Sequence, residues 1–525
     1  MLKILGNIYK LMNNIQFINL TSHPYNIVDN TNNIIKIVNQ APMIDDSLYL
    51  LPPFCLRNYN TANINDKHQN DLLNESLNRL SQELNKYVLI SYPTKIKDCL
   101  LDVYYYILGN GSKKFIGNLN FELNHYQKQP LQKLNFIYNN KSYTILPYLD
   151  EIHELCDENI ILQDIKPFSY QHYLNVLDDF EKINFPINII YQSINSFQSG
   201  NLYPGLVAVR SNNENYYSEL YPAEGVLDID KFSKFKDTDK NFDSIIYKSL
   251  IVGLNRFMKI NKFNDVVIGI SGGIDSAVVA TLATEALGAD HVIGLIMPSM
   301  FTTSLSITDA EQLSNNLKID YYILPITSIY NTTLDVLKPV FKKTKFSTAE
   351  ENLQARIRML LLMAYSNKFG HIVLNCSNKS ELSVGYGTLY GDLAGSISVI
   401  GDLYKTQVYQ IANYINEINT KEIIPKSIIT KAPSAELHAD QKDEDTLPPY
   451  DLLDLILYNW IEENRWSEST EKLMHKLDLD ISNIEIKKWE NLKKIISANE
   501  FKRNQLAPII RLSHKPLNEV SFSFI

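Results

Sequence analysis

Hydrophobic residues in the second half of the chain follow two alternating patterns. Residues 265–270 are a short β-branched run bounded by polar residues, typical of a buried strand, whereas residues 274–287 carry Ala, Val and Leu at helical spacing. The same patterns predict strands at 291–297, 321–326 and 371–376, and helices at 306–317 and 348–368. Strands that alternate with helices pair in parallel through right-handed crossovers, and ligands bind at their carboxyl ends. We therefore expect a doubly wound parallel sheet.

Residues 231–241 separate two stretches of different pattern, because this segment is rich in charge and has no sustained apolar period. Before it, short predicted strands such as 87–91 and 188–191 alternate with helices, which favours an α/β layer fold. After it, residues 242–259 have the pattern of an amphipathic helix. Because 525 residues exceed what one hydrophobic core usually organises, we predict two α/β domains, 1–242 and 243–525.

Composition narrows the class of protein. A formal net charge of -9 argues against non-specific binding of nucleic acid, which needs a basic surface. Asn and Lys interrupt every apolar run near the N-terminus, and no apolar run of 18 residues occurs, so neither secretion nor membrane insertion is expected. The four cysteines lack C-x-x-C spacing, which predicts neither a zinc site nor a disulfide framework. These features favour a cytoplasmic protein.

A glycine-rich turn, Ser271-Gly272-Gly273-Ile274-Asp275-Ser276, lies between the first predicted strand and helix. Glycines let backbone N–H groups approach an anion, and the first N–H groups of a helix favour negative charge. The lysine of the Walker motif is missing, so we expect the turn to bind the α- and β-phosphates of a nucleotide. SGGxDS resembles the loop of the ATP pyrophosphatases, which cleave ATP to AMP and pyrophosphate. The expected ATP site begins with Gly269 and Ile270 and continues through these six residues.

Other polar segments follow predicted strands or lie on predicted helices. Residues 351–358 place Asn352 and Arg356 on one helix face, which is also the pattern of a solvated face. Residues 377–381 follow a strand and open a helix, and Glu381 adds a carboxylate suited to Mg²⁺. Lys405 follows a turn-dense stretch and can neutralise phosphate as a point charge. The acidic run 440–445, taken alone, is typical of a solvated loop.

Eight segments in a fixed order resemble the NAD⁺ synthetases: SGGIDSA, MPS, ENLQARIRM, NKSELSVGYGTLYGD, PSAEL, DQKDED, LPPYD and EFKRNQ. They span about residues 243–512. The resemblance implies a sheet of the adenine nucleotide alpha hydrolase type and an ATP-dependent ligase. In that family, ATP activates the nicotinate carboxylate of deamido-NAD⁺, pyrophosphate leaves, and ammonia attacks the adenylate. A homodimer or higher homo-oligomer is also implied.

The resemblance assigns roles to individual residues. It implies catalytic roles for Asp275 and Lys405, magnesium ligation by Asp275 and Glu381, further ATP contacts from Cys376, Lys405 and Ser434, and deamido-NAD⁺ contacts from Asn352, Glu381 and Lys502. Cys376 departs from the family pattern, which often has threonine at this position. Since a thiol is a poorer hydrogen-bond partner than a hydroxyl, Cys376 is either an ATP contact or a small buried strand residue.

In relatives of this length, the front domain is a nitrilase-like glutaminase with an α/β/β/α sandwich. Its cysteine nucleophile, glutamate base and lysine release ammonia from glutamine. Here residues 51–59 resemble the glutamate segment with Pro53 in place of the glutamate, and Asn120 is the counterpart of the lysine. Residues 145–148 resemble the strand end that carries the cysteine, with Pro147 in its place. These changes predict a lost glutaminase and free ammonia as donor, with Cys156 left as an alternative nucleophile.

Three alternatives remain open from the sequence. The first is a glutamine-dependent synthetase whose ammonia comes from an unrecognised nucleophile or a partner. The second is another ATP pyrophosphatase that amidates a purine nucleotide or a tRNA base, although the acidic composition disfavours tRNA and ENLQARIRM with KRNQ disfavours GMP synthesis. The third is a pseudoenzyme whose front domain serves as a scaffold. The intact SGGIDS and NKSE segments disfavour this third possibility for the whole chain.

Overall fold

The computed structural model divides the chain into two compact units, Met1–Lys240 and Asn241–Ile525. It describes residues 15–22, 26–44, 47–57, 66–97, 100–122, 133–146, 159–164, 168–183, 188–193, 195–198, 200–211, 214–228, 231–234, 240–342, 344–438, 441–462, 492, 494–513 and 515–517. None of the helices described there is long and apolar enough to cross a membrane.

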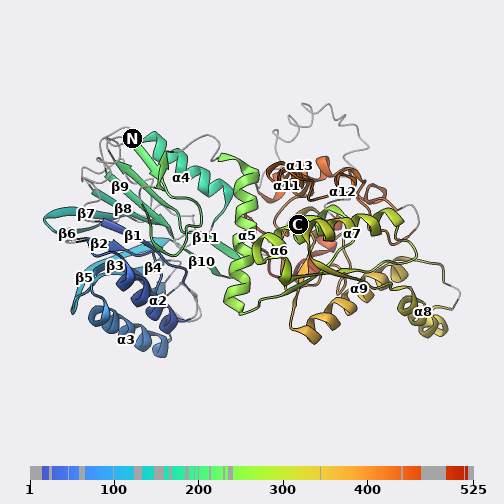
Figure 1. Ribbon diagram of the computed structural model, residues 1–525, viewed down its shortest axis with the longest axis horizontal. Coiled ribbons are helices and arrows are strands. Elements are labelled where there is room, and N and C mark those ends of the chain that lie inside the picture. The colour runs from blue at the N-terminus through green and yellow to red at the C-terminus, as the bar shows by residue number, and fades with distance from the viewer. Residues whose placement is uncertain are drawn as a thin grey trace. The chain divides into compact units, whose positions relative to one another are not determined.

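The front unit contains two large sheets (Figure 1). The first has the order β14-β1-β2-β3-β4-β5, made of Gly225–Val226, Ile15–Asn19, Leu48–Leu50, Tyr87–Lys97, Leu100–Gly109 and Ser112–Glu122. The second has the order β15-β13-β12-β9-β8-β7-β6, made of Ser233–Lys234, Glu214–Tyr217, Val207–Ser211, Asn188–Ser193, Asn159–Asp164, Lys141–Leu146 and Leu134–Tyr138. A separate hairpin pairs β10 (Asn195–Gln198) with β11 (Asn201–Pro204).

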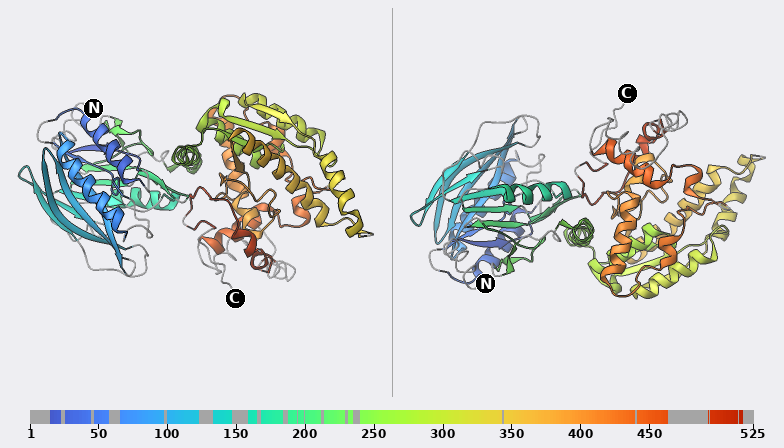
Figure 2. Two further views of the ribbon diagram at one scale, coloured as in Figure 1. Left: turned by 90° about the horizontal axis from the view of Figure 1, so that it is seen from below. Right: turned by 90° about the horizontal axis from the view of Figure 1, so that it is seen from above.

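Successive side chains of a strand point to opposite faces of its sheet, and this alternation produces the layers of this unit. In β3, Leu89 packs into the core between the two sheets, whereas Val88 and Ile90 pack against α2 (Ile27–Gln40) and α3 (Lys67–Glu83). On the second sheet, Phe180 of α4 (Tyr170–Lys182) contacts the Tyr191 ring. Seen from below in Figure 2, α2 and α3 lie in front of the strands. The unit is an α/β/β/α sandwich, which confirms the predicted fold class.

The second unit is built on a five-stranded sheet in which every pairing is parallel. Its order is β18-β17-β16-β19-β20, formed by Asp320–Ile323, Val292–Ile296, Val266–Gly269, Ile372–Asn375 and Ile397–Ser398. The chain runs from β16 outward through β17 to β18, then returns to the other side of β16 as β19. The winding therefore reverses at the carboxyl end of β16, where a doubly wound sheet binds its ligands.

Helices lie on both faces of this sheet. Val267 of β16 packs in one core cluster with Ile357 and Leu362 of α9 (Thr348–Phe369), whereas its neighbours Val266 and Ile268 face the other way. Other helices in the described part of this unit are α5 (Phe242–Asn261), α6 (Ile274–Leu287), α7 (Ser304–Leu317), α8 (Thr327–Phe341), α10 (Lys379–Val384), α11 (Lys405–Ile418), α12 (Lys426–Thr430), α13 (Tyr450–Ile461) and α16 (Glu500–Arg503), with short 3₁₀ turns η4 (Ala289–His291) and η5 (Asp443–Asp445). The predicted doubly wound sheet is thus confirmed.

Candidate functional site

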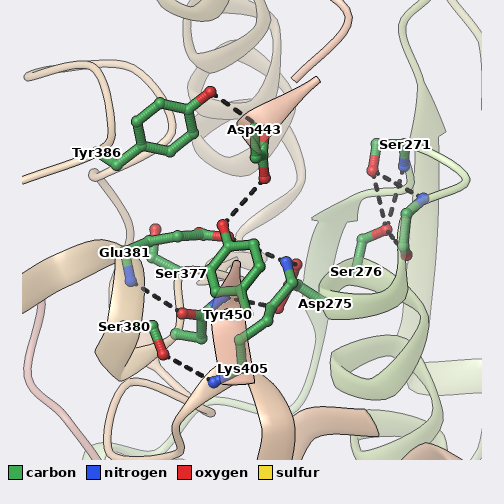
Figure 3. Close-up of polar contacts among 12 residues, drawn as sticks. Ser271, Asp275, Ser276, Ser377, Ser380, Glu381, Tyr386, Lys405, Asp443 and Tyr450 are labelled. Carbon is green, nitrogen blue, oxygen red and sulfur yellow. Dashed lines mark hydrogen bonds and ion pairs between the residues drawn. The ribbon is translucent and has the colours of Figure 1, made fainter. Parts of the chain in front are cut away.

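The glycine-rich turn connects β16 to α6 at the point where the winding reverses, and hydrogen bonds within the turn hold its shape (Figure 3). The hydroxyls of Ser271 and Ser276 lie 3.1 Å apart, and the Gly273 N–H donates to Ser271 Oγ at 3.2 Å. The Ser276 hydroxyl donates to the Gly273 carbonyl at 3.0 Å. No side chain caps the start of α6, so its first N–H groups are open to an anion, as the sequence pattern suggested.

Beside this turn, a buried lysine bridges two carboxylates. Lys405 Nζ lies 2.5 Å from Asp275 Oδ2 and 3.0 Å from Glu381 Oε1, and its side chain is 3% exposed. Asn378 Nδ2 donates to the other oxygen of Asp275 at 2.9 Å. Burial opposes the charge of Lys405, but Asp275 and then Glu381 outweigh it and raise the pKa of the ammonium above its usual value. The lysine is therefore a fixed positive charge beside the turn.

Burial changes the pKa of Glu381. Burial raises the pKa of Glu381 to about 7, although the Lys405 ammonium acts in the opposite direction. Burial also raises the pKa of Asp443, which accepts hydrogen bonds from Tyr386 at 3.1 Å and Tyr450 at 2.9 Å. These carboxylates carry excess negative charge in a confined place, so a cation or a group that donates protons is favoured there.

A cavity of about 500 Å³ joins these groups. It is lined by the turn after β16, α9, the turn after α10, the start of α11, residues 431–437, Gln441, Asp443 and α16. Nearly all residues expected from the sequence to contact ATP line it, namely Gly269, Ile270, Ser271, Gly273, Ile274, Asp275, Ser276, Cys376, Lys405 and Ser434. The three residues expected to contact deamido-NAD⁺, Asn352, Glu381 and Lys502, line the same cavity. Gly272 instead packs behind the turn, against Ser306.

The candidate substrate residues are held by their neighbours. Asn352 Oδ1 accepts a hydrogen bond from the Thr388 hydroxyl at 2.7 Å. Lys502 Nζ donates to the carbonyls of Gly385 at 2.8 Å and Gly387 at 2.9 Å. These contacts brace the turn that follows α10 from two sides, α9 and α16, so the turn forms a fixed wall of the cavity.

The candidate ATP residues outside the turn are Ser434 and Cys376. The Ser434 hydroxyl donates to the Gln441 carbonyl at 2.6 Å and accepts from the Glu436 N–H at 3.1 Å. For Cys376, burial and then the charge of Asp275 raise the pKa of the thiol above its usual value. Cys376 is therefore a neutral thiol at the carboxyl end of β19.

Some residues of the site were not assigned by the sequence. Asn378 is the N-cap of α10, a position that N-K-S-E indicates, but its contact with Asp275 joins segments 103 residues apart. Asp443 lies in the acidic run expected to be a solvated loop; its neighbours Glu444 and Asp445 are exposed, but Asp443 is 4% exposed and points to Tyr386 and Tyr450. The expectation is wrong for Asp443, because two tyrosine hydroxyls satisfy its carboxylate inside the protein.

Magnesium chemistry fits Asp275 and Glu381 in part. Mg²⁺ prefers oxygen ligands and is usually bound by one or two carboxylates together with substrate phosphates and water. Among the described residues, no group of three His, Cys, Asp or Glu side chains could hold a metal by itself. Two carboxylates beside a glycine-rich turn at a helix start suit an ion that shares its ligands with a nucleotide.

In the front unit, the described positions to which the resemblance assigns the glutamate and the lysine lie on a strand of the first sheet or just beyond one. Pro53 is buried three residues after β2, and Asn120 is half-buried in β5, opposite Asp102 of β4. Pro147, Cys99 and Cys156 lie outside the described residues. Burial raises the pKa of the Cys55 thiol, which is 2% exposed, to about 12. Cys55 is therefore an unreactive packing residue.

A doubly wound sheet with a glycine-rich turn and an uncapped helix start at its switch point is the arrangement typical of nucleotide-binding α/β proteins. Comparison with known proteins identifies the family. The NAD synthase family model matches residues 246–506, and a glutamine-dependent NAD(+) synthetase of Acinetobacter baylyi is 34% identical over 70% of this chain and 68% of its own length. The chain belongs to the NAD synthase family, as the motifs predicted.

Two further relatives show how much of the chain is similar to known proteins. A glutamine-dependent NAD(+) synthetase of Thermotoga maritima is 46% identical over 51% of this chain, but the match spans only 45% of that protein. A solved glutamine-dependent NAD+ synthetase of Acinetobacter baumannii, in complex with ADP, matches 97% of both chains with a TM-score of 0.70 and 27% identity. The similarity to that structure extends over both units.

Proposed function

We propose that this protein is a ligase that forms a carbon–nitrogen bond, converting deamido-NAD⁺ to NAD⁺ at the expense of ATP. The observation that carries the proposal is the bridge from Lys405 to Asp275 and Glu381, beside the SGGIDS turn and inside one cavity. The relatives are named NAD(+) synthetases, and a related structure holds ADP. The cavity also contains side chains suited to a second substrate, which a site for ATP alone does not need.

The first half of the reaction activates the acid. An oxygen of the nicotinate carboxylate attacks the α-phosphorus of ATP, the bond from that phosphorus to the bridging oxygen breaks, and pyrophosphate leaves with the electron pair. Lys405 and the open N–H groups at the start of α6 stabilise the charge that develops on the leaving oxygens. When bound by Asp275 and Glu381, Mg²⁺ would supply further neutralisation of the phosphates.

The second half forms the amide. The nitrogen of ammonia attacks the carbonyl carbon of the adenylate, the bond from that carbon to the AMP oxygen breaks, and the nitrogen loses one proton. No nucleophilic side chain is required, because holding the reactants together and stabilising charge supply much of the acceleration. In this proposal Asp275 and Lys405 are the catalytic residues, the turn with Cys376 and Ser434 holds ATP, and Asn352, Glu381 and Lys502 contact deamido-NAD⁺.

We further propose that ammonia comes from solution and not from glutamine bound to the front domain. In support, Pro53 and Asn120 stand where the resemblance implies glutamate and lysine, and Pro147 where it implies cysteine. The side chain of neither proline can donate a proton, accept one or attack as a nucleophile. The competing function is a glutamine-dependent synthetase, which the names of the relatives favour and for which Cys156 is the remaining candidate nucleophile.

The organisation of the protein follows from these proposals. Residues 1–242 form a nitrilase-like domain without glutaminase activity, and residues 243–525 form the synthetase domain. Cytoplasmic location rests on the cysteine pattern, which indicates a reducing compartment. A homo-oligomer rests on the family resemblance, and exposed apolar side chains of the synthetase unit offer a surface for it.

The deciding experiment measures NAD⁺ formation from deamido-NAD⁺ and Mg-ATP, with ammonium in one reaction and glutamine in the other. Rates should be appreciable with ammonium and equal to the donor-free background with glutamine. Equal rates of NAD⁺ formation with both donors would indicate a working glutaminase and contradict the free-ammonia proposal. No NAD⁺ with either donor would sink the synthetase proposal itself.

A further inference from the structure

Tyr450, the first residue of α13, contacts three charged groups of the site at once (Figure 3). Its hydroxyl lies 2.9 Å from Asp443 Oδ2 and 3.4 Å from Glu381 Oε1. The Lys405 ammonium lies 5.2 Å from the centre of its ring. Tyr450 is itself 9% exposed and is absent from the described residues that line the cavity, so it lies behind the wall that Glu381, Lys405 and Asp443 form.

The ring of Tyr450 limits where the Lys405 ammonium can lie. Lysine has a flexible four-carbon side chain, and fixing its end takes contacts from several sides. Asp275 and Glu381 supply two of these contacts, and the face of the Tyr450 ring supplies a third through cation–π attraction. The ammonium is thereby held at one point beside the glycine-rich turn.

The hydroxyl of Tyr450 connects Glu381 to a second buried carboxylate. Because the hydroxyl has a single proton and Asp443 is the nearer acceptor, the proton is directed to Asp443, while Tyr386 donates to the other Asp443 oxygen at 3.1 Å. Tyr386 belongs to the turn after α10, the helix that carries Glu381. Asp443 therefore ties α13 to the element that positions Glu381.

The same face of α13 also fixes the backbone from which Lys405 projects. Asp454 lies one turn after Tyr450, accepts a hydrogen bond from the Thr406 N–H at 2.8 Å, and bonds the Ser380 hydroxyl. Ser380 Oγ in turn accepts from the Lys405 N–H at 2.8 Å. Thus α13 holds the backbone of Lys405 through Asp454 and the tip of its side chain through Tyr450.

We propose that Tyr450 and Asp443 are positioning residues of the synthetase reaction, which hold Lys405 and Glu381 where the departing pyrophosphate develops charge. This inference rests on the proposed function and assigns a role to residues that act through others. A fixed cation stabilises a transition state better than one that must be ordered during the reaction. Loss of these contacts should slow the adenylation step and leave ground-state nucleotide affinity nearly unchanged.

The test compares Tyr450→Phe, which keeps the ring and removes the hydroxyl, with Tyr450→Leu, which removes both. Tyr458→Phe is the matched control, because Tyr458 lies on the same helix and is 44% exposed. Adenylation is measured as deamido-NAD⁺-dependent exchange of labelled pyrophosphate into ATP, ADP affinity by calorimetry, and folding by thermal unfolding. All variants are made in the full chain.

We expect Tyr450→Phe to lower the kcat of exchange by about tenfold, as loss of a hydrogen bond to a buried charged group does, with KM and the ADP Kd within about twofold. Tyr450→Leu should be slower by about a further tenfold, because the cation–π contact is lost as well. The double variant Tyr450→Phe with Asp443→Asn should lose less than the product of the two single losses, since the two side chains share one hydrogen bond.

Three results would overturn the proposal: unchanged exchange in Tyr450→Phe, an equal loss in Tyr458→Phe, or a loss of ADP affinity or folding that accounts for the whole effect. A wild-type chain that neither exchanges pyrophosphate nor forms NAD⁺ would overturn the proposed function together with this inference. An active wild type with an unaffected Tyr450→Phe would overturn this inference alone. The two failures are therefore distinguishable.

Discussion

Gly272 lies against the carbonyl of Ser306, so that a β-carbon placed on Gly272 would be 2.2 Å from that oxygen. Gly272 also has a φ of +75°, in the region that favours glycine. This contact joins the turn after β16 to the first turn of α7, and it explains why Gly272 shapes the glycine-rich turn without lining the cavity. The turn can approach α7 this closely because Gly272 has no side chain.

Gly272→Ala should therefore displace the turn and not merely strain it. We expect the free energy of unfolding to fall by about 2 kcal/mol or more, because backbone must move, and ADP affinity to fall by more than about tenfold. Gly370→Ala is the control: Gly370 ends α9 with a φ of +77° and has no atom within 4 Å of an added β-carbon. This control should lose about 1 kcal/mol and keep its ADP affinity. Equal effects of the two substitutions in calorimetry would refute the steric argument.

The front unit should not react with an electrophilic glutamine analogue. A diazo-ketone analogue of glutamine alkylates an activated thiolate, but burial keeps Cys55 protonated, and Pro53 cannot act as a base. Intact-mass measurement of the full chain after incubation should show no adduct. An adduct mapped by peptide digestion to Cys156 would restore the glutamine-dependent alternative, and the variant Cys156→Ala should then lose it.

Replacing Lys502 should weaken the binding of deamido-NAD⁺ more than the binding of ADP. Its ammonium holds the carbonyls of Gly385 and Gly387, in the turn whose Thr388 bonds Asn352. Lys502→Met removes two charge-assisted hydrogen bonds, so we expect the KM for deamido-NAD⁺ to rise by about tenfold or more, with the ADP Kd within about twofold. Lys494→Met is the control, since Lys494 is exposed in the same stretch of chain. A parallel loss of ADP affinity in Lys502→Met would contradict the separation of the two subsites.

Much of the synthetase fold is predictable because its central strands β16, β17 and β19 are largely buried and several of its helices carry local end signals. Helix α6 has the bounds predicted from the sequence, 274–287, with Gly273 before it and Gly288 after it. Helix α8 was not predicted, although Tyr330, Leu334 and Leu337 recur in it at helical spacing. Of its residues only Tyr330 is buried, and Pro339 lies inside it, which argues against a helix from composition. Strand β3 continues past the predicted end at 91 because a register shift after Pro93 accommodates the proline.

The site was predictable to the extent that its residues belong to local motifs. The turn, Glu381 and Lys405 stand out because glycines, hydroxyls and charges follow predicted strands. Tyr450 and Asp443 do not, since the sequence does not reveal that a tyrosine at a helix start meets a carboxylate seven residues earlier. Which member of an acidic run turns inward depends on tertiary partners, and here these are Tyr386 and Tyr450.

An apolar face of the synthetase unit should mediate self-association. We propose that exposed side chains of β18, α8 and α9 form it: Tyr322, Ile323, Val336, Val340, Leu360, Met363 and Phe369. Val336 and Val340 are the most exposed, at 71% and 73%, and lie one helical turn apart. Replacing both with Lys should convert a dimer to a monomer in light scattering, because burying two charges costs several kcal/mol. Ile137→Lys in β6 of the front unit, at an exposed position outside this face, should leave the mass unchanged. A monomeric wild type would contradict the assignment.

Glu381 should make the stability of the free protein depend on pH in a direction opposite to that of a paired surface carboxylate. Burial raises its pKa to about 7, compared with about 4.3 in an unfolded chain, so the folded protein binds this proton more tightly than the unfolded chain. The stabilising contribution is therefore fully present below pH ~4.3 and is lost as the pH rises through about 7.

Glu381→Gln removes this titration while keeping the shape of the side chain. Relative to wild type, we expect the variant to gain about 2 kcal/mol in the free energy of unfolding between pH 5 and pH 8, because only the wild type must bury a carboxylate at the higher pH. The comparison uses thermal unfolding of the full chain at both pH values, with EDTA and without nucleotide, so that no cation compensates the charge. Glu444→Gln serves as the control, since Glu444 is exposed in the acidic run. A difference between Glu381→Gln and wild type that stays constant with pH would show that Glu381 keeps its charge throughout this range.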